Sequence, residues 1–410
     1  MLTRRDLLQR SGGAALTAGA GLVPLRWLLA AERPRLPPAL PEGTRATAIL
    51  HALPGKQPLI RLTDRPPNYE TPIHYFNTLY TPNDAFFVRY HLADIPEVDA
   101  RNWRLRVGGN AAGTPTEFSM DDLRRFQTVE VAAVCMCSGN RRGLFEPHVP
   151  GVQWSNGAMG NARWRGVRLR DVLDKAGARE DAMEVAFDGA DGPVIERTPD
   201  FQKSLPMWKA RDENTLIAFE MNGAPLPHWN GFPARLVVPG WTATYWVKHL
   251  TAITVLPGSF DGFWMKGAYR VPTRTFPVVQ HFLTQATEAN EPITEMLVTS
   301  LITNVADGQR VSVGQSIPIQ GVAWDGGYGI RAVEVSSDGG KTWHLASLDQ
   351  TADRFSFRQW RFDWVPRQAG QHTIFVKASN RLGQTQASDR IPNPAGYYDN
   401  VVARVNLTAA

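Results

Sequence analysis

Hydrophobic and polar positions alternate over short stretches along most of the chain, and few stretches repeat at helical spacing. Apolar runs at 129–134 and 234–240 predict buried strands that lead into turns. The segment 119–125 predicts a short helix capped by its first serine, and 167–176 predicts a helix that ends beside Gly177. Because short helices are scattered among strands, we expect an α+β domain.

The pattern changes near residue 290. From residue 296 to 407, short strands and turns follow one another without a convincing helix. Residues 331–337 alternate, and the Asp-Gly-Gly-Lys sequence at 338–341 predicts a hairpin turn. Regular short strands over this length predict an all-β, immunoglobulin-like sandwich. Alone, such a sandwich implies an accessory or assembly module.

The N-terminal part carries a targeting pattern. The segment 3–8, Thr-Arg-Arg-Asp-Leu-Leu, resembles a twin-arginine export signal. The weakly apolar stretch after it is interrupted by Pro24 and Arg26, so it makes a poor membrane-spanning helix. We therefore expect export to the periplasm and no membrane span after leader removal. The expected organisation is a leader at 1–31, an extended Pro-rich arm at 32–70, a main domain at 71–288 and the immunoglobulin-like domain at 289–410.

Composition narrows the function classes. The chain has 410 residues, of which 43% are hydrophobic and 20% charged, as in globular proteins with a sizeable core. The formal charge is +5, and four arginines and one aspartate within residues 1–31 account for +3 of it. A mature chain this close to neutral gives no argument for nucleic acid binding. Two cysteines exclude a disulfide framework.

The chemistry centres on Cys137, which follows the first apolar run and precedes a Gly-Asn turn and two arginines. Cations favour the thiolate form of a cysteine, and thiolates select soft or redox-active metals. Guanidinium groups suit an oxyanion held bidentately. The residues thus indicate a metal centre that acts on a small oxyanion. The alternative is a buried cysteine that serves as a small hydrophobe, which is how we interpret Cys135.

Two segments resemble the sulfite oxidase family. Residues 134–142, Val-Cys-Met-Cys-Ser-Gly-Asn-Arg-Arg, resemble its molybdenum-binding segment, which implies that the Cys137 thiolate is the protein ligand to molybdenum carried by molybdopterin. Residues 81–91, Thr-Pro-Asn-Asp-Ala-Phe-Phe-Val-Arg-Tyr-His, resemble its sulfite-binding segment. This match implies that Arg89 binds sulfite and that His91 contacts the pterin.

Further segments of the main domain carry the resemblance. It implies that Arg142 is a second anion-binding arginine, that Tyr269 presents a hydroxyl to the substrate or an oxo group, and that Trp154 walls the anion pocket. A core tryptophan is the alternative for Trp154. In the animal enzymes an arginine stands where this chain has Ala395, so a third cationic contact is absent or comes from elsewhere.

A pterin-cradling segment completes the set. The run 230–235, Asn-Gly-Phe-Pro-Ala-Arg, and Lys248 resemble it, which implies that Asn230, Arg235 and Lys248 bind the cofactor. A pterin phosphate needs cations and turn amides, whereas the alternative is solvated charge at strand ends.

The resemblance implies a periplasmic sulfite dehydrogenase that passes electrons to a c-type cytochrome. The chain has no C-x-x-C-H haem motif, so we expect a separate acceptor. The C-terminal domain is expected to form a homodimer or to meet a cytochrome subunit. One alternative is a sulfane dehydrogenase of a sulfur-oxidising complex, and an alternative of a different class is a cofactor-free binding or assembly protein.

Overall fold

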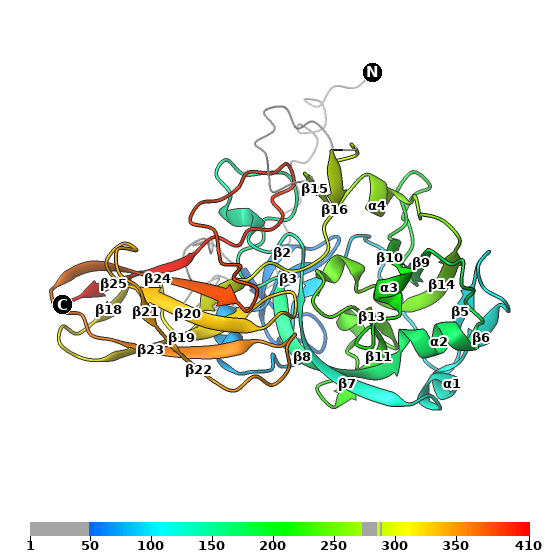
Figure 1. Cartoon of the computed structure of the whole chain (residues 1–410), viewed down its shortest axis with the longest axis horizontal. Helices are drawn as coiled ribbons and strands as arrows, with labels where there is room; N and C mark the ends of the chain where they lie inside the picture. Colours follow the sequence, from blue (N-terminus) through cyan, green and yellow to red (C-terminus); the bar gives the residue numbers. More distant parts are fainter. Residues whose placement is uncertain (1–48, 273–284, 288) are drawn as a thin grey trace, which may run out of the picture. The chain divides into compact units, whose positions relative to one another are not determined.

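The computed structural model describes residues 49–272, 285–287 and 289–410 (Figure 1). The leader expected at 1–31 and the first part of the expected arm lie outside these residues. Within the described ranges no helix is both long enough and apolar enough to cross a membrane. Strands predominate, and the helices are short.

The first sheet carries one edge of the candidate site. It has the order β1-β2-β3-β4, and all of its pairs are antiparallel. Residues 49–70, which we expected as part of an extended arm, supply three of its strands because Leu59, Ile60 and Tyr69 are buried. The strand expected around 85–91 is short, and it ends at Arg89. The strands are β1 Ile49–His51, β2 Leu59–Thr63, β3 Asn68–Glu70 and β4 Val88–Arg89.

Two further sheets build the core of the main domain. One has the order β10-β9-β14-β5-β6, and the other has the order β12-β11-β8-β7, with β13 also paired to β11. Their buried apolar side chains form one cluster, which includes Cys135 and Cys137. The strands are β5 Leu105–Gly108, β6 Thr116–Phe118, β7 Thr128–Met136, β8 Met159–Arg168, β9 Glu184–Gly189, β10 Lys203–Pro206, β11 Leu216–Met221, β12 Ala224–Pro225, β13 Arg235–Val237 and β14 Leu250–Leu256.

Both predicted helices are confirmed. Ser119 caps the first in a capping box with Asp122, and Gly177, at φ +66°, follows the second. The second helix begins at Leu169, two residues later than predicted, because 167–168 end strand β8. The helices are α1 Met120–Arg124, α2 Leu169–Lys175, α3 Met207–Ala210 and α4 Phe263–Lys266, with 3-10 turns η2 Ile73–Asn77, η3 Arg142–Leu144, η4 His228–Asn230 and η5 Ala243–Tyr245.

The C-terminal domain contains no helix within its described residues, which confirms the all-β prediction. Its two sheets have the orders β17-β19-β23-β22 and β18-β25-β24-β20-β21 and share one apolar cluster. The immunoglobulin-like designation stays a prediction. A two-stranded ribbon, β15-β16, precedes this domain. The strands are β15 Arg270–Pro272, β16 Asn290–Pro292, β17 Thr299–Ile302, β18 Gln309–Val311, β19 Ile317–Trp324, β20 Ile330–Ser336, β21 His344–Leu345, β22 Ser347–Leu348, β23 Arg358–Trp364, β24 Gly370–Asn380 and β25 Ala403–Ala409.

Candidate metal and cofactor site

One cavity collects most of the residues that the sequence predicted for the site. They come from separate elements: β4, the loop after β7, the turn η4, strand β13 and the segment before β15. The space enclosed by the lining residues, counted together with its open mouth, is about 650 Å³. The predicted residues that line it are Arg89, His91, Cys137, Asn230, Arg235, Lys248 and Tyr269.

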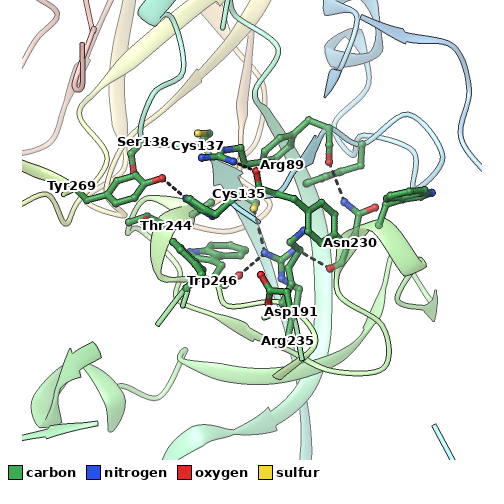
Figure 2. Close-up of a pocket in the computed structure, with 18 residues that line it drawn as sticks. Arg89, Cys135, Cys137, Ser138, Asp191, Asn230, Arg235, Thr244, Trp246 and Tyr269 are labelled. Carbon is green, nitrogen blue, oxygen red and sulfur yellow. Dashed lines mark hydrogen bonds between the residues drawn. The ribbon is translucent and has the colours of Figure 1, made fainter. Parts of the chain in front are cut away.

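Cys137 lies in the lining of this cavity (Figure 2), where a network of hydrogen bonds holds its loop. Its N–H donates to the Ala158 carbonyl at 2.9 Å, and its carbonyl accepts from the Asn140 N–H at 2.9 Å. The Asn140 Oδ1 accepts in turn from the Ala158 N–H at 3.0 Å. Arg141 adopts a left-handed φ of 71° and donates its N–H to the Ser155 carbonyl. The thiol is therefore presented from a fixed loop.

Arg89 brings a cation to the same end, beside Cys137 (Figure 2). Its Nη1 donates to Asn68 Oδ1 at 3.3 Å and to the Tyr90 carbonyl. No carboxylate pairs with this guanidinium within the described part of the chain. A half-buried cation without a protein anion is suited to hold an anionic substrate.

His91 and Tyr269 form a hydrogen-bonded pair in the lining of the cavity. The His91 ring also stacks on Phe201, with 3.6 Å between ring centres. Burial lowers the pKa of His91 well below its ordinary value, and the charges of Arg89, Lys248 and Lys203 lower it further. The imidazole is therefore neutral. Tyr269 has a left-handed φ of 58°, an uncommon conformation for a non-glycine residue that aims its side chain into the site.

The other end of the cavity contains buried cations. Arg235 donates to the Asn230 carbonyl at 3.0 Å and to the Trp246 carbonyl at 2.9 Å, while its Nε has no partner among the described residues. Lys248 Nζ is buried and has no hydrogen-bond partner among the described residues. Burial lowers the pKa of Lys248, and the nearby Asp191 opposes this shift. Burial likewise raises the pKa of Asp191.

These groups fit an anionic organic cofactor. A buried basic group with no hydrogen-bonded anion is costly to charge, so the Lys248 amine and the Arg235 guanidinium edge match a ligand that carries negative charge. Asn230 is fixed between Lys56, which donates to its Oδ1 at 2.6 Å, and the Phe87 carbonyl, which accepts from its Nδ2 at 3.1 Å. The cations and the fixed amide are the groups that a pterin phosphate requires.

Two predicted residues lie outside the lining. Arg142 donates its Nε to the Ala395 carbonyl at 2.6 Å and its Nη1 to the Val152 carbonyl at 3.3 Å. Its charge still reaches Tyr269, because it lowers the pKa of that phenol against the larger effect of burial. Trp154 is fully buried in the apolar core, which agrees with the alternative interpretation of this residue as a core tryptophan.

The cavity also contains residues that sequence reasoning missed. Cys135 lines it, with its Sγ 3.9 Å from Arg235 Nη2, and burial raises the pKa of this thiol to about 11. Its spacing of two from Cys137, which directly follows strand β7, was a usable signal, because residues i and i+2 of an extended segment share a face. Asp191 and Phe201 come from the loop after β9, where no motif marked them.

Comparisons with known proteins agree with this geometry. The family described as "Oxidoreductase molybdopterin binding domain" matches residues 91–264, and the family described as "Mo-co oxidoreductase dimerisation domain" matches residues 290–410. Together, these matches define the chain as a molybdopterin oxidoreductase.

The relatives narrow this class. Mitochondrial sulfite oxidase from Macaca fascicularis is 36% identical over 87% of this chain and 67% of its own length, and the Homo sapiens protein is 36% identical over 79% and 60%. The sulfane dehydrogenase SoxCD from Paracoccus pantotrophus has a similar structure, with a TM-score of 0.72, 26% identity and coverage of 83% of this chain and 84% of that chain. The chain thus belongs to the sulfite oxidase family, and it spans 60 to 67% of the length of these two mammalian relatives.

Proposed function

We propose that the protein oxidises sulfite to sulfate at a molybdenum–molybdopterin centre bound in this cavity. The observation that carries the proposal is the meeting of Cys137, Arg89 and Tyr269 at one end of a cavity whose other end holds buried cations. The first group suits a metal beside a small oxyanion, and the second suits the anionic part of an organic cofactor.

Each end has its own task. Cys137 is the protein ligand to molybdenum, and Asn230, Arg235, Lys248 and His91 bind the pterin. When bound, the cofactor supplies a transferable oxygen atom and accepts two electrons. Overall, sulfite and water would give sulfate, two protons and two electrons.

The substrate is positioned by the residues beside Cys137. Arg89 binds the sulfite oxygens through charge-assisted hydrogen bonds, and Arg142 adds positive charge from behind. The Tyr269 hydroxyl would donate a hydrogen bond to a substrate oxygen. Its partner, the neutral His91, would donate from Nε2–H to the same hydroxyl oxygen and so keep the phenol oriented.

A sulfane dehydrogenase is the second candidate, favoured by the structural similarity to SoxCD along most of both chains. Its substrate would be sulfur bound to a carrier protein. The two candidates differ in the size of the substrate, so free sulfite and a persulfidated carrier peptide are the discriminating substrates.

We also propose the cellular setting. The twin-arginine pattern supports a periplasmic location, and a c-type cytochrome is the proposed electron acceptor. The C-terminal domain is proposed to form a homodimer, which the description of its matched family supports. A heterodimer with a cytochrome subunit is the alternative assembly.

The test combines turnover and metal analysis on one sample. Purified protein from cells able to make the cofactor is assayed for sulfite-dependent reduction of cytochrome c, and its molybdenum content is measured. Cys137→Ser is expected to abolish turnover, because a hydroxyl is a poor ligand for this metal. Cys135→Ser is the matched control, and it should keep most of the activity. Near-normal sulfite oxidation by Cys137→Ser would contradict the metal assignment.

A further inference from the structure

A column of aromatic rings and cations runs behind the candidate substrate site. The guanidinium of Arg142 lies 5.2 Å from the ring centre of Tyr397. The Tyr397 ring stacks on Tyr269, with ring centres 5.5 Å apart and planes 20° apart. On Tyr269 a second cation follows, since Lys203 Nζ lies 5.2 Å from its ring centre.

The column is buried and well supported. Tyr397 is 5% exposed and Lys203 is fully buried. Lys203 Nζ donates to the Trp264 carbonyl at 2.7 Å and also lies 4.6 Å from the ring centre of Tyr245. Asn393 clamps the Tyr397 backbone, because its Oδ1 accepts from the Tyr397 N–H at 2.9 Å and its Nδ2 donates to the Tyr397 carbonyl at 2.7 Å. Tyr397 is therefore a rigid platform.

Tyr397 comes from the C-terminal domain, whereas Tyr269 precedes the ribbon strand β15. The left-handed backbone of Tyr269 is intrinsically unfavourable, so contacts on its side chain have to maintain its direction. The partners of its hydroxyl, His91 and Arg89, hold the tip of the ring but not its plane. Stacking on Tyr397 sets the plane.

We propose that Tyr397 is a positioning residue that holds the Tyr269 phenol in its productive orientation toward the substrate. The Arg142 guanidinium also lies against the Tyr397 ring, and the Ala395 carbonyl fixes that guanidinium. The C-terminal domain thus contributes an aromatic platform to the active site. This inference rests on the proposed function for its kinetic consequence, but the contact itself can be tested independently.

The test uses the loaded enzyme and a set of matched variants. Tyr397→Leu removes the ring and is expected to lower kcat/KM for sulfite roughly 10- to 100-fold at unchanged molybdenum content, because a small misplacement of a reacting group is costly. Tyr397→Phe keeps the ring and is expected to stay within about twofold of wild type. Tyr398→Phe is the neighbouring control, since the Tyr398 hydroxyl accepts from the Thr294 N–H, a group that is not part of the column. If Tyr397→Leu does not fold, Tyr397→Met makes the same comparison with a flexible side chain.

A double-mutant cycle shows through which residue Tyr397 acts. In the Tyr269→Phe background the phenol is already missing, so Tyr397→Leu should cause little further loss. The proposal would be overturned if Tyr397→Leu lowered kcat/KM as much in the Tyr269→Phe background as in wild type. It would also be overturned if Tyr397→Leu alone had wild-type kinetics. Calorimetric titration with sulfate supplies a readout without turnover, and Tyr397→Leu is expected to weaken binding.

The proposed function can fail separately. If wild-type enzyme with full molybdenum content does not oxidise sulfite, the substrate assignment falls. The double-mutant cycle is then repeated with the free energy of unfolding in urea as the measured quantity. Non-additive effects of Tyr397→Leu and Tyr269→Leu would support the platform, and additive effects would overturn it.

Discussion

Lys56 Nζ donates a hydrogen bond of 2.6 Å to Oδ1 of Asn230, a residue 174 positions further along the chain. The same ammonium donates to the carbonyls of Asn83 at 2.6 Å and Phe86 at 3.0 Å. Lys56 lies between β1 and β2, so the N-terminal sheet fixes an amide that the cofactor is proposed to contact.

Lys56→Met should therefore lower both cofactor retention and stability. Loss of a buried charge-assisted hydrogen bond costs about 1.5–3 kcal/mol, and Asn230 would lose one of its two anchors. We expect a lower molybdenum content per chain and a lower free energy of unfolding in urea. Gln57→Ala, which removes an exposed hydrogen bond to Asp84, is the control. A molybdenum content equal to that of the control would contradict the anchoring role.

Arg89→Gln should mainly raise KM for sulfite. The substitution removes a charge that has no carboxylate partner among the described residues, so about 1.5–3 kcal/mol of substrate binding is lost, or roughly 10- to 100-fold in KM. Initial rates over a range of sulfite concentrations measure this change. Arg104→Gln, at an exposed arginine paired with Glu117, should leave KM unchanged. An unchanged KM in Arg89→Gln would remove Arg89 from the substrate site.

Lys248→Met should have opposite effects on loaded and cofactor-free protein. Without cofactor the Lys248 side-chain nitrogen is buried and has no hydrogen-bond partner in the described chain, so its replacement by an apolar side chain is expected to stabilise by about 1–3 kcal/mol. With cofactor available, the loss of this cation should reduce the bound molybdenum. Urea unfolding of protein from cells that lack the cofactor, with exposed Lys175→Met as control, measures the first effect. Destabilisation of the cofactor-free variant would refute the role of Lys248 as a group kept for cofactor binding.

His249 predicts a loss of stability in acid. Its Nε2 pairs with the Tyr90 hydroxyl at 2.7 Å and its Nδ1 with the Phe232 carbonyl at 2.6 Å, and burial lowers its pKa from 6.5 to about 3. Between these values the unfolded chain binds a proton that the folded chain does not, so the stability is present above pH 6.5 and is lost as the pH falls toward 3.

The expected loss attributable to His249 between pH 7 and pH 4.5 is about 2–3 kcal/mol. Urea unfolding at both pH values measures the total, and the same measurement on His249→Gln removes this contribution. Equal pH dependence in the two proteins would show that His249 does not cause it.

Local patterns were enough to find the residues that present the chemistry. Cys137 and Arg89 each end a strand within a distinctive run, and the structure brings them to one end of one cavity. The orientation of Arg142 could not be predicted in this way, because a carbonyl 253 residues away accepts from its Nε. Asp191 and Phe201 lie in a loop without periodicity, so only the tertiary structure places them in the lining.

Local sequence patterns predicted the fold to a similar extent. The capped helix α1 and the alternating strands of the C-terminal domain follow from local rules, and both are present. The pairing of 49–70 into a sheet was missed because prolines suggested an extended arm, whereas burial of Leu59 and Ile60 favours pairing. Whether a segment pairs into a sheet also depends on a partner strand elsewhere in the sequence. The pattern of one segment alone therefore does not reveal the pairing.

The link between Tyr397 and Tyr269 has a consequence for how the protein is made. A ribosome releases the chain from its N-terminus, so Cys137, Arg89 and Tyr269 all emerge before the platform that orients the last of them. Strand β7, which leads to Cys137, also waits for a later segment, since the Val134 N–H donates to the Phe355 carbonyl at 2.9 Å. Nascent chains should therefore be unable to take up the cofactor in its active arrangement, and loading becomes a step that follows the completion of synthesis.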